Sequence, residues 1–317
     1  MEKCKCELYH DNFQNFKRYD IPKAQLVIAD IPYNIGVDAY ASNPMWYKNG
    51  DNKNGESKLA KSNFFNTDGT FKIAEYMHFC NRLLKKEPKE RGQAPAMIVF
   101  CAFEQMQTVI DYGKQYGFTK SYPLFFVKNY SAQVLKANMK IVGATEFAVV
   151  LYRNKLPKFR NVDSKGTPHM VFNWFEWKRD SSKEYPKIHP TQKPVGVLKR
   201  LIEVFTDPGD VVIDPVAGSG ATLRAAYELG RNAYGFEVDK GFYISAMEKM
   251  IPRETDMRSR PARSKPVRSR PAQITTAMGT LIDKWTAISG GPADTAKEDD
   301  LSRSLREMAE ELESDGT

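Results

Sequence analysis

The sequence lacks any hydrophobic run long enough to cross a membrane as a helix, and its first ten residues, MEKCKCELYH, lack the apolar stretch of a signal peptide. Only four cysteines occur, at Cys4, Cys6, Cys80 and Cys101. Cys4 and Cys6 have neither a second close cysteine pair nor a histidine set that would complete a zinc pattern. These absences predict a soluble, cytoplasmic protein with reduced thiols and no structural metal.

Acidic residues are absent from segment 257–273, MRSRPARSKPVRSRPAQ, which holds six basic residues. Segment 290–317 holds nine acidic and three basic residues, so the charges of the two segments cancel. The net charge of +8 therefore comes from the rest of the chain, and it favours a polyanionic partner.

Short apolar runs alternate with segments of helical spacing over residues 24–250. We expect strands at 24–29, 96–103, 122–128, 146–153, 210–213 and 233–236, and helices at 71–86, 105–117, 194–205, 221–229 and 241–250. This alternation predicts an α/β fold with a mostly parallel, doubly wound, Rossmann-like sheet.

The composition changes after residue 252. Residues 253–273 are rich in proline and arginine and predict an unstructured basic linker. Residues 274–317 contain two amphipathic helical patterns and predict a helical hairpin. Its apolar stripe predicts a contact with a second copy of the chain or with a partner protein.

The stretch VVIDPVAGSGATLRAA, residues 211–226, predicts a strand that ends at Asp214, a glycine loop and a helix. Gly218 and Gly220 allow sharp turns and close approach of the backbone to a ligand. Glu237 stands at the end of the next expected strand, which is the arrangement of a nucleoside-binding crevice. Leu223 occupies the place of the third glycine of a dinucleotide fingerprint, and Asp214 favours a cation over phosphate, so we expect a ligand without pyrophosphate.

An earlier stretch, ADIPYNIG at residues 29–36, follows the apolar run AQLVI. Together with HPTQKPVGVLKRLIEVFTDPGDVVIDPVAGSGATLRAAYELGRNAYGFEVDKGFY, it resembles the S-adenosylmethionine-dependent DNA amino-methyltransferases, which methylate adenine N6 or cytosine N4. The order of the motifs resembles that of the permuted group often called the beta class. The resemblance runs from about Leu8 to Met250 and is weak between residues 37 and 70.

The resemblance implies a methyltransferase domain over residues 1–252, with the circularly permuted methyltransferase fold. Its catalytic half would be 1–153 and its cofactor-binding half 188–252. A target-recognition segment would occupy about 154–187, together with the loop 37–70.

The resemblance also implies that the DIPY motif acts on the exocyclic amine of a base, which is a weak nucleophile because its lone pair is delocalised. The Asp30 carboxylate and the Ile31 carbonyl would accept the amine hydrogens, Pro32 would fix the turn, and Tyr33 would stack on the flipped base. The family usually has proline where this chain has Ile31, but a backbone carbonyl survives that exchange.

For the cofactor, the resemblance implies a contact of Asp11 with the adenine, and contacts of Thr191 and Lys193 with the methionine carboxylate. His189 and Glu146 match family positions to which we assign structural roles, in packing or hydrogen bonding. The full set of expected cofactor residues is Asp11, Thr191, Lys193, Asp214, Val216, Gly218, Ser219, Gly220 and Glu237. Val216 replaces the usual phenylalanine of the loop.

The segment 155–180 interleaves basic and aromatic residues, which can contact phosphates and bases. The same composition fits an apolar patch beneath a loop, and the 253–273 linker fits either a salt-sensitive DNA contact or a solvated spacer. The expected DNA-binding residues are Trp174, Trp177, Lys178, Arg179, Arg258 and Arg260.

The sequence therefore predicts a site-specific methyltransferase that acts on adenine N6 in double-stranded DNA by base flipping and direct in-line transfer, either alone or in a restriction-modification or phage system. Cytosine N4 is the close alternative, although cytosine members more often have serine at the position of Asp30. An RNA or protein-glutamine methyltransferase would normally have its motif after the glycine loop. A nicotinamide oxidoreductase and a non-catalytic DNA-binding module are the remaining alternatives. The prediction requires the residues near 30 and near 218 to be spatial neighbours.

Overall fold

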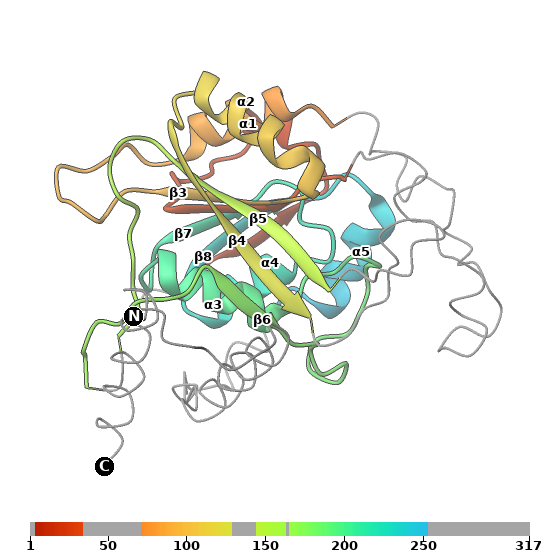
Figure 1. Ribbon diagram of the computed structural model, residues 1–317. Coiled ribbons are helices and arrows are strands. Elements are labelled where there is room, and N and C mark those ends of the chain that lie inside the picture. Colours follow the sequence, from red (N-terminus) through yellow and green to blue (C-terminus); the bar gives the residue numbers. More distant parts are fainter. Residues whose placement is uncertain (1–3, 34–70, 129–143, 163–164, 253–317) are drawn as a thin grey trace, which may run out of the picture. The chain divides into compact units, whose positions relative to one another are not determined.

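The computed structural model describes residues 4–33, 71–128, 144–162 and 165–252. They are organised by one eight-stranded sheet with the order β1-β8-β7-β2-β3-β5-β4-β6 (Figure 1). Only β5 runs antiparallel to its neighbours within this sheet. The predicted α/β class with a mostly parallel sheet is confirmed, while the loop 37–70, the linker 253–273 and the tail 274–317 lie outside the described residues.

The strands are β1 (Cys6–Tyr9), β2 (Leu26–Asp30), β3 (Ala96–Cys101), β4 (Lys120–Lys128), β5 (Thr145–Tyr152), β6 (Trp174–Trp177), β7 (Val211–Asp214) and β8 (Asn232–Phe236). The helices are α1 (Ile73–Leu83), α2 (Met106–Gln115), α3 (Val195–Phe205), α4 (Ala221–Glu228) and α5 (Lys240–Lys249), with short 3₁₀ helices η1 (Phe13–Arg18) and η3 (Phe103–Gln105). Each helix predicted within 71–250 is present. Strands β1 and β6 were not predicted, because four residues at a sheet edge are too few to show a period.

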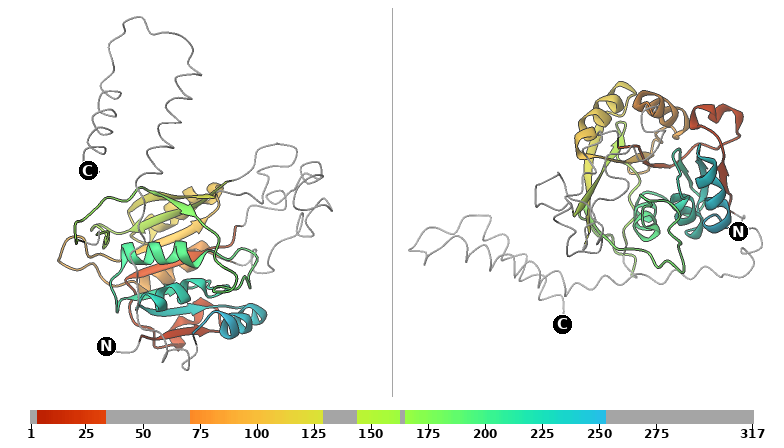
Figure 2. Two further views of the ribbon diagram at one scale, coloured as in Figure 1. Left: turned by 90° about the horizontal axis from the view of Figure 1, so that it is seen from below. Right: turned by 90° about the vertical axis from the view of Figure 1, so that its right-hand side faces the viewer.

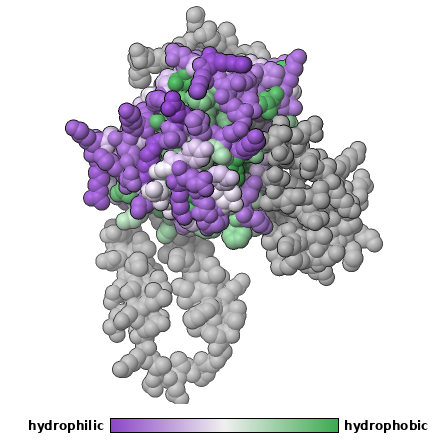
Figure 3. All heavy atoms as spheres, turned by 90° about the horizontal axis from the view of Figure 1, so that it is seen from above, coloured by the Kyte–Doolittle hydropathy of each residue, from purple (hydrophilic) through white to green (hydrophobic). Residues whose placement is uncertain are grey.

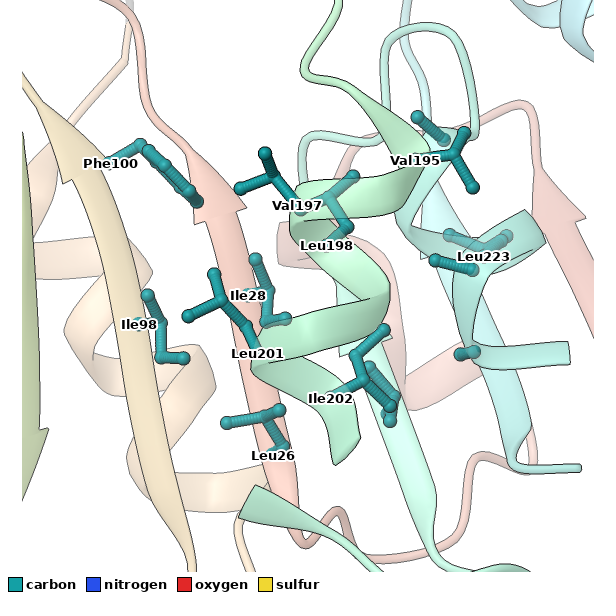
Figure 4. Packing of buried hydrophobic residues seen from close by; sticks show 14 of the residues in the cluster. Leu26, Ile28, Ile98, Phe100, Val195, Val197, Leu198, Leu201, Ile202 and Leu223 are labelled. Atoms are coloured by element: carbon teal, nitrogen blue, oxygen red, sulfur yellow. The ribbon is translucent and has the colours of Figure 1, made fainter. Parts of the chain in front are cut away.

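The sheet separates two apolar cores, one on each face, and helices cover both faces (Figure 2). Strand β2 contributes to both cores, because successive side chains of a strand point to opposite faces. Leu26 and Ile28 pack in the cluster beneath α3 and α4, which Figure 4 shows, whereas Val27 and Ala29 pack in the cluster beneath α1 and α2. All four side chains are buried, so β2 is a central strand fixed from both sides.

Helix α3 begins after Pro194, which has no side-chain group to cap the helix. The Asp180 carboxylate supplies the missing acceptors, at 2.7 Å from the Val195 amide nitrogen and 3.3 Å from that of Gly196. A negative charge at a helix N-terminus also interacts favourably with the helix dipole. The segment before α3 is thereby tied to its first turn.

The surface over α1 and α2 is mostly hydrophilic in the part that the structure describes (Figure 3). Within the same residues, no helix combines the length and the apolar character needed to span a bilayer.

We predict that Leu201→Ala lowers the free energy of unfolding by about 2–5 kcal/mol, because the side chain is fully buried between α3 and β2 and its loss leaves a cavity (Figure 4). Chemical denaturation measures this loss. Leu156→Ala is the matched control, since Leu156 is 47% exposed and its truncation should cost less than about 1 kcal/mol. Equal losses in the two variants would contradict this description of the core.

Candidate functional site

Four carboxylates lie at the carboxyl ends of four neighbouring strands, along one side of the sheet. Asp30 ends β2 and Asp214 ends β7, while Glu237 directly follows β8 and Asp11 follows β1. These strands are consecutive and parallel in the sheet, so their carboxyl ends share an edge. The chain continues from β7 to β8 on one side and from β2 to β3 on the other, and a ligand crevice forms where the strand order reverses in this way. The residues near 30 and near 218 thus follow neighbouring strands, as the sequence-based prediction requires.

The glycine loop after β7 is held in place by the acid after β8. The Gly218 amide donates to Glu237 Oε2 at 2.8 Å, and the Asp239 amide donates to Glu237 Oε1 at 2.7 Å. Gly218 and Gly220 have φ angles of 53° and 74°, which favour glycine. The side chain of Ser219 is buried within the loop. Glu237 is therefore fixed in orientation, and it holds the backbone of the glycine loop at Gly218.

The place of Leu223 explains how the helix packs without a third glycine in the loop. A Cβ atom added to Gly235 of β8 would lie 2.8 Å from Leu223 Cδ1. Close packing between helix and strand, which the third glycine allows in dinucleotide sites, is here provided by a glycine on the strand.

The pKa of the Asp214 carboxylate is strongly raised. The residue is 4% exposed, and burial raises its pKa from 3.8 to about 7, although hydrogen bonds from the Thr222 side chain and the Val216 amide oppose the rise. A desolvated carboxylate is stabilised by a cation. Together with the glycine loop, this group fits S-adenosylmethionine, which carries positive charge on its sulfonium and ammonium groups.

The DIPY turn is fixed by its own core residue and by a glutamine. Ile31 is buried and its amide donates to the Phe100 carbonyl at 3.1 Å, so the residue that replaces proline anchors the turn in the core. Gln105 Nε2 donates to the Pro32 carbonyl at 2.9 Å, and Gln105 Oε1 accepts from the Ala102 amide at 3.1 Å. Gln105 was not predicted as a site residue, since only the pairing of β2 with β3 brings it to this turn.

Asp30 belongs to a chain of alternating charges. Its Oδ2 atom lies 2.7 Å from Lys193 Nζ, which lies 3.1 Å from Glu146 Oε2. The other Glu146 oxygen lies 2.5 Å from Lys128 Nζ. The Lys193 ammonium also lies 5.4 Å from the centre of the Tyr33 ring. Lys193 was predicted to bind the cofactor carboxylate, and the structure places its ammonium between two protein carboxylates.

The segment before α3 also reaches the glycine loop. Thr191 Oγ1 lies 3.2 Å from His189 Nδ1, and the His189 ring packs against Phe242 and lies within 3.5 Å of the Cβ position of Gly218. Burial and the Lys193 charge lower the pKa of His189 to about 4, so the ring is neutral at physiological pH. This placement favours the structural role assigned to His189.

Asp11 is engaged locally. Its Oδ1 atom accepts from the Asn12 amide and the Asn15 side chain, both at 2.7 Å, and its Oδ2 atom accepts from the Tyr19 hydroxyl at 2.9 Å. These hydrogen bonds lower the pKa of Asp11, the Asn15 bond most of all. Asp11 thus fixes the turn after β1, and its contact with the cofactor adenine stays a prediction.

The expected DNA-binding residues fall into different environments. Trp174 is 43% exposed and stacks on Phe172 with ring centres 6.3 Å apart, and Lys178 Nζ lies 2.9 Å from Glu176. Arg179 is exposed. Trp177 does not fit a surface contact, because it is 4% exposed and packs in the core against Phe126. Arg258 and Arg260 lie outside the described residues. Among the residues described, no cluster of three or more potential metal ligands occurs.

A family model described as DNA methylase, for N6 and N4 methyltransferases, matches residues 24–248. The chain belongs to this DNA methylase family. The methylase is 28% identical over 262 residues to the DNA adenine methyltransferase YhdJ of Escherichia coli strain K12. The aligned residues cover 77% of this chain and 81% of YhdJ. It is 44% identical over 62 residues to the type II methyltransferase M.HindIII of Haemophilus influenzae, which is 20% of each chain.

Solved structures show the same fold. The M1.HpyAVI–SAM complex has a TM-score of 0.54 at 21% identity and covers 76% of this chain and 97% of its own. The cytosine-N4-specific PvuII DNA methyltransferase also has a TM-score of 0.54, at 13% identity, and covers 80% of this chain and 90% of its own. The predicted methyltransferase fold is thus confirmed, and the circular permutation of its motifs stays a prediction. S-adenosylmethionine, the predicted cofactor, is bound in the first of these two structures.

We predict that Gly220→Ala weakens cofactor binding, because it strains the backbone and also crowds the glycine loop. An added Cβ would lie 3.0 Å from Ile251 Cδ1, and φ is +74°. Gly230→Ala is the matched control, because Gly230 has a φ of +75° and nothing within 4 Å of its Cβ position. The positive φ should cost each variant about 1–2 kcal/mol of stability, and the contact with Ile251 should add to the loss in Gly220→Ala. Only Gly220→Ala should also raise the dissociation constant for S-adenosylmethionine, measured by calorimetry, and an equal rise in both would count against the loop assignment.

We also predict that the affinity for S-adenosylmethionine depends on the ionisation of Asp214. Burial raises the pKa of Asp214 from 3.8 to about 7, so the protein without cofactor loses stability as the pH rises through about 7 and Asp214 ionises. A bound cation stabilises the ionised carboxylate and offsets this loss. The affinity should therefore fall about tenfold between about pH 8 and about pH 6. Asp214→Asn should remove this dependence in calorimetric titrations, and a dependence that survives the substitution would assign it to another group.

Proposed function

We propose that this DNA methyltransferase transfers the methyl group of S-adenosylmethionine to the N6 amine of adenine in double-stranded DNA, inside the cell. The observation that carries the proposal is the position of Asp30 and the glycine loop at the ends of the paired parallel strands β2 and β7. Asp30 in place of serine favours adenine, and so does the printed name of the Escherichia coli relative.

When bound, S-adenosylmethionine supplies a methyl group on a positively charged sulfur atom. Gly218, Gly220 and Glu237 would hold its nucleoside part, and Asp214 would face its cationic part. Val216 and Ser219 complete the loop. Thr191 would bind the carboxylate of the methionine part, and Asp11 the adenine.

The residues of the DIPY turn would prepare the target amine. The Asp30 carboxylate and the Ile31 carbonyl would accept its two hydrogens, so that the nitrogen lone pair points away from the base plane. Among the described residues, the Ile31 carbonyl accepts no hydrogen bond, whereas that of Pro32 is taken by Gln105. Tyr33 would stack on the extruded base and offset part of the cost of unstacking, which is a few kcal/mol. The proton released after alkylation would go to Asp30 or to solvent.

For target recognition, we propose Trp174, Lys178 and Arg179, with Phe172 added as the stacking partner of Trp174. The loop 37–70, Arg258 and Arg260 complete this proposal from the sequence. The domain boundaries at 153, 187 and 252 are also proposed from the sequence. So is the contact of the tail helices with a second copy of the chain or with a partner protein.

Nucleoside analysis of DNA incubated with the protein and labelled S-adenosylmethionine tests the proposed reaction. We expect N6-methyladenine, and N4-methylcytosine alone would end the adenine proposal. Asp30→Ala should lower the rate by at least about 100-fold, because it removes the acceptor that holds the amine. Its affinity for the cofactor serves as the control and should stay close to that of the wild type.

Transfer of label to RNA or to a protein, and none to DNA, would favour the alternative substrates. DNA binding without any methylation by the wild type would favour the non-catalytic module.

A further inference from the structure

The two oxygen atoms of Asp30 have different environments. Oδ2 lies 2.7 Å from Lys193 Nζ, whereas Oδ1 is buried and forms no hydrogen bond of ordinary geometry among the residues described. The Tyr33 hydroxyl is also buried without such a bond, and its interaction with the Asp30 carboxylate lowers the pKa of Asp30. A buried carboxylate oxygen without a partner is costly, unless a ligand supplies the missing donor. The free oxygen therefore marks the side of Asp30 at which a donor would bind.

Lys193 is held on both sides. Its side chain is 7% exposed, and its ammonium lies 2.7 Å from Asp30 and 3.1 Å from Glu146. Glu146 is itself paired with Lys128 at 2.5 Å. Two positive and two negative charges alternate along this chain, so it is neutral as a whole. The Lys193 ammonium also lies 5.4 Å from the Phe100 ring centre, which further limits its movement.

Such a network is a poor way to stabilise a fold. Removing charges from water costs several kcal/mol for each ion, and apolar residues of the same volume often stabilise a protein as well or better. Its position beside the end of β2 instead favours a role at the reaction centre.

We propose that Lys193 is a positioning residue for Asp30, which binds Oδ2 and leaves Oδ1 to accept a hydrogen from the target amine, with Glu146 and Lys128 holding the ammonium in place. This inference rests on the proposed function of Asp30. It replaces the predicted contact of Lys193 with the cofactor carboxylate.

The chemistry requires Asp30 to be ionised, since a protonated carboxyl would lose part of its capacity to accept. Burial raises the pKa of Asp30, and the positive charge of Lys193 opposes that rise, while Glu146 adds to it. The titratable groups that face Asp30 from the surrounding elements are Lys193, Glu146, Tyr33, Cys101 and Asp214. Of these, Lys193 is the one that favours the charged carboxylate most strongly.

Two substitutions should move the same limb of the pH–rate profile in opposite directions. Lys193→Met removes the positive charge at similar length, so the acidic limb should move up by about 1–3 pH units and the rate should fall about 100-fold at neutral pH. Glu146→Gln removes a negative charge and keeps the shape, so the limb should move down. Lys199→Met is the matched control, because Lys199 pairs with Glu228 at 2.5 Å, away from Asp30, and should leave the profile unchanged.

Calorimetric titration with S-adenosylmethionine separates the two roles of Lys193. The affinity of Lys193→Met should stay within about threefold of the wild type, well under the tenfold that corresponds to 1.4 kcal/mol. A loss of tenfold or more with an unmoved pH limb would restore the cofactor role and overturn the proposal. If Lys193→Met does not fold, the downward shift in Glu146→Gln decides, and no shift or an upward shift would overturn it.

A readout that needs no methyl transfer keeps this inference apart from the proposed function. The Asp30 carboxyl can be titrated by carbon-13 nuclear magnetic resonance of aspartate-labelled protein, with its signal assigned by Asp30→Asn. Its midpoint should rise in Lys193→Met and fall in Glu146→Gln. A wild type that methylates no DNA would end the proposed function alone, whereas midpoints that do not move would end the positioning role alone.

Discussion

The parallel pairing of β2 with β7 is the constraint on which the site depends. Leu26 pairs with Val212 and Val27 with Ile213, so both strands reach the same edge of the sheet with their carboxyl ends. A shift of the pairing by one residue would exchange the side chains that β2 presents to the two cores, and the packing of both cores opposes it. The apolar side chains of the strand thus fix where the DIPY turn lies relative to the glycine loop.

This arrangement gathers negative charge, and each carboxylate at the edge is stabilised differently. Asp11 is held by neighbouring side chains, Glu237 by two backbone amides, and Asp30 by the ammonium of Lys193. Asp214 has no such cationic partner among the residues described, and its pKa is raised to about 7. Asp214 is therefore a carboxylate that a bound cation would stabilise.

Two departures from familiar motifs are compensated elsewhere in the fold. Ile31 stands where proline is usual, and its buried side chain together with Gln105 holds the turn that a second proline would stiffen. Leu223 stands where a third glycine would lie, and Gly235 on the facing strand gives its side chain room. In both cases the packing requirement is met by a different residue.

The sequence by itself determined the α/β class, the five helices within 71–250 and the family, because these follow from local periodicity and from two motifs that are each contiguous. It did not reveal strands β1 and β6, because each has only four residues and is defined by its pairing with a neighbouring strand. Nor did it reveal the partner of Lys193, because a lysine in the chain carries no information about which distant carboxylate will face it. Only the tertiary structure decided that partner, by bringing the segment before α3 against the end of β2 and the start of β5.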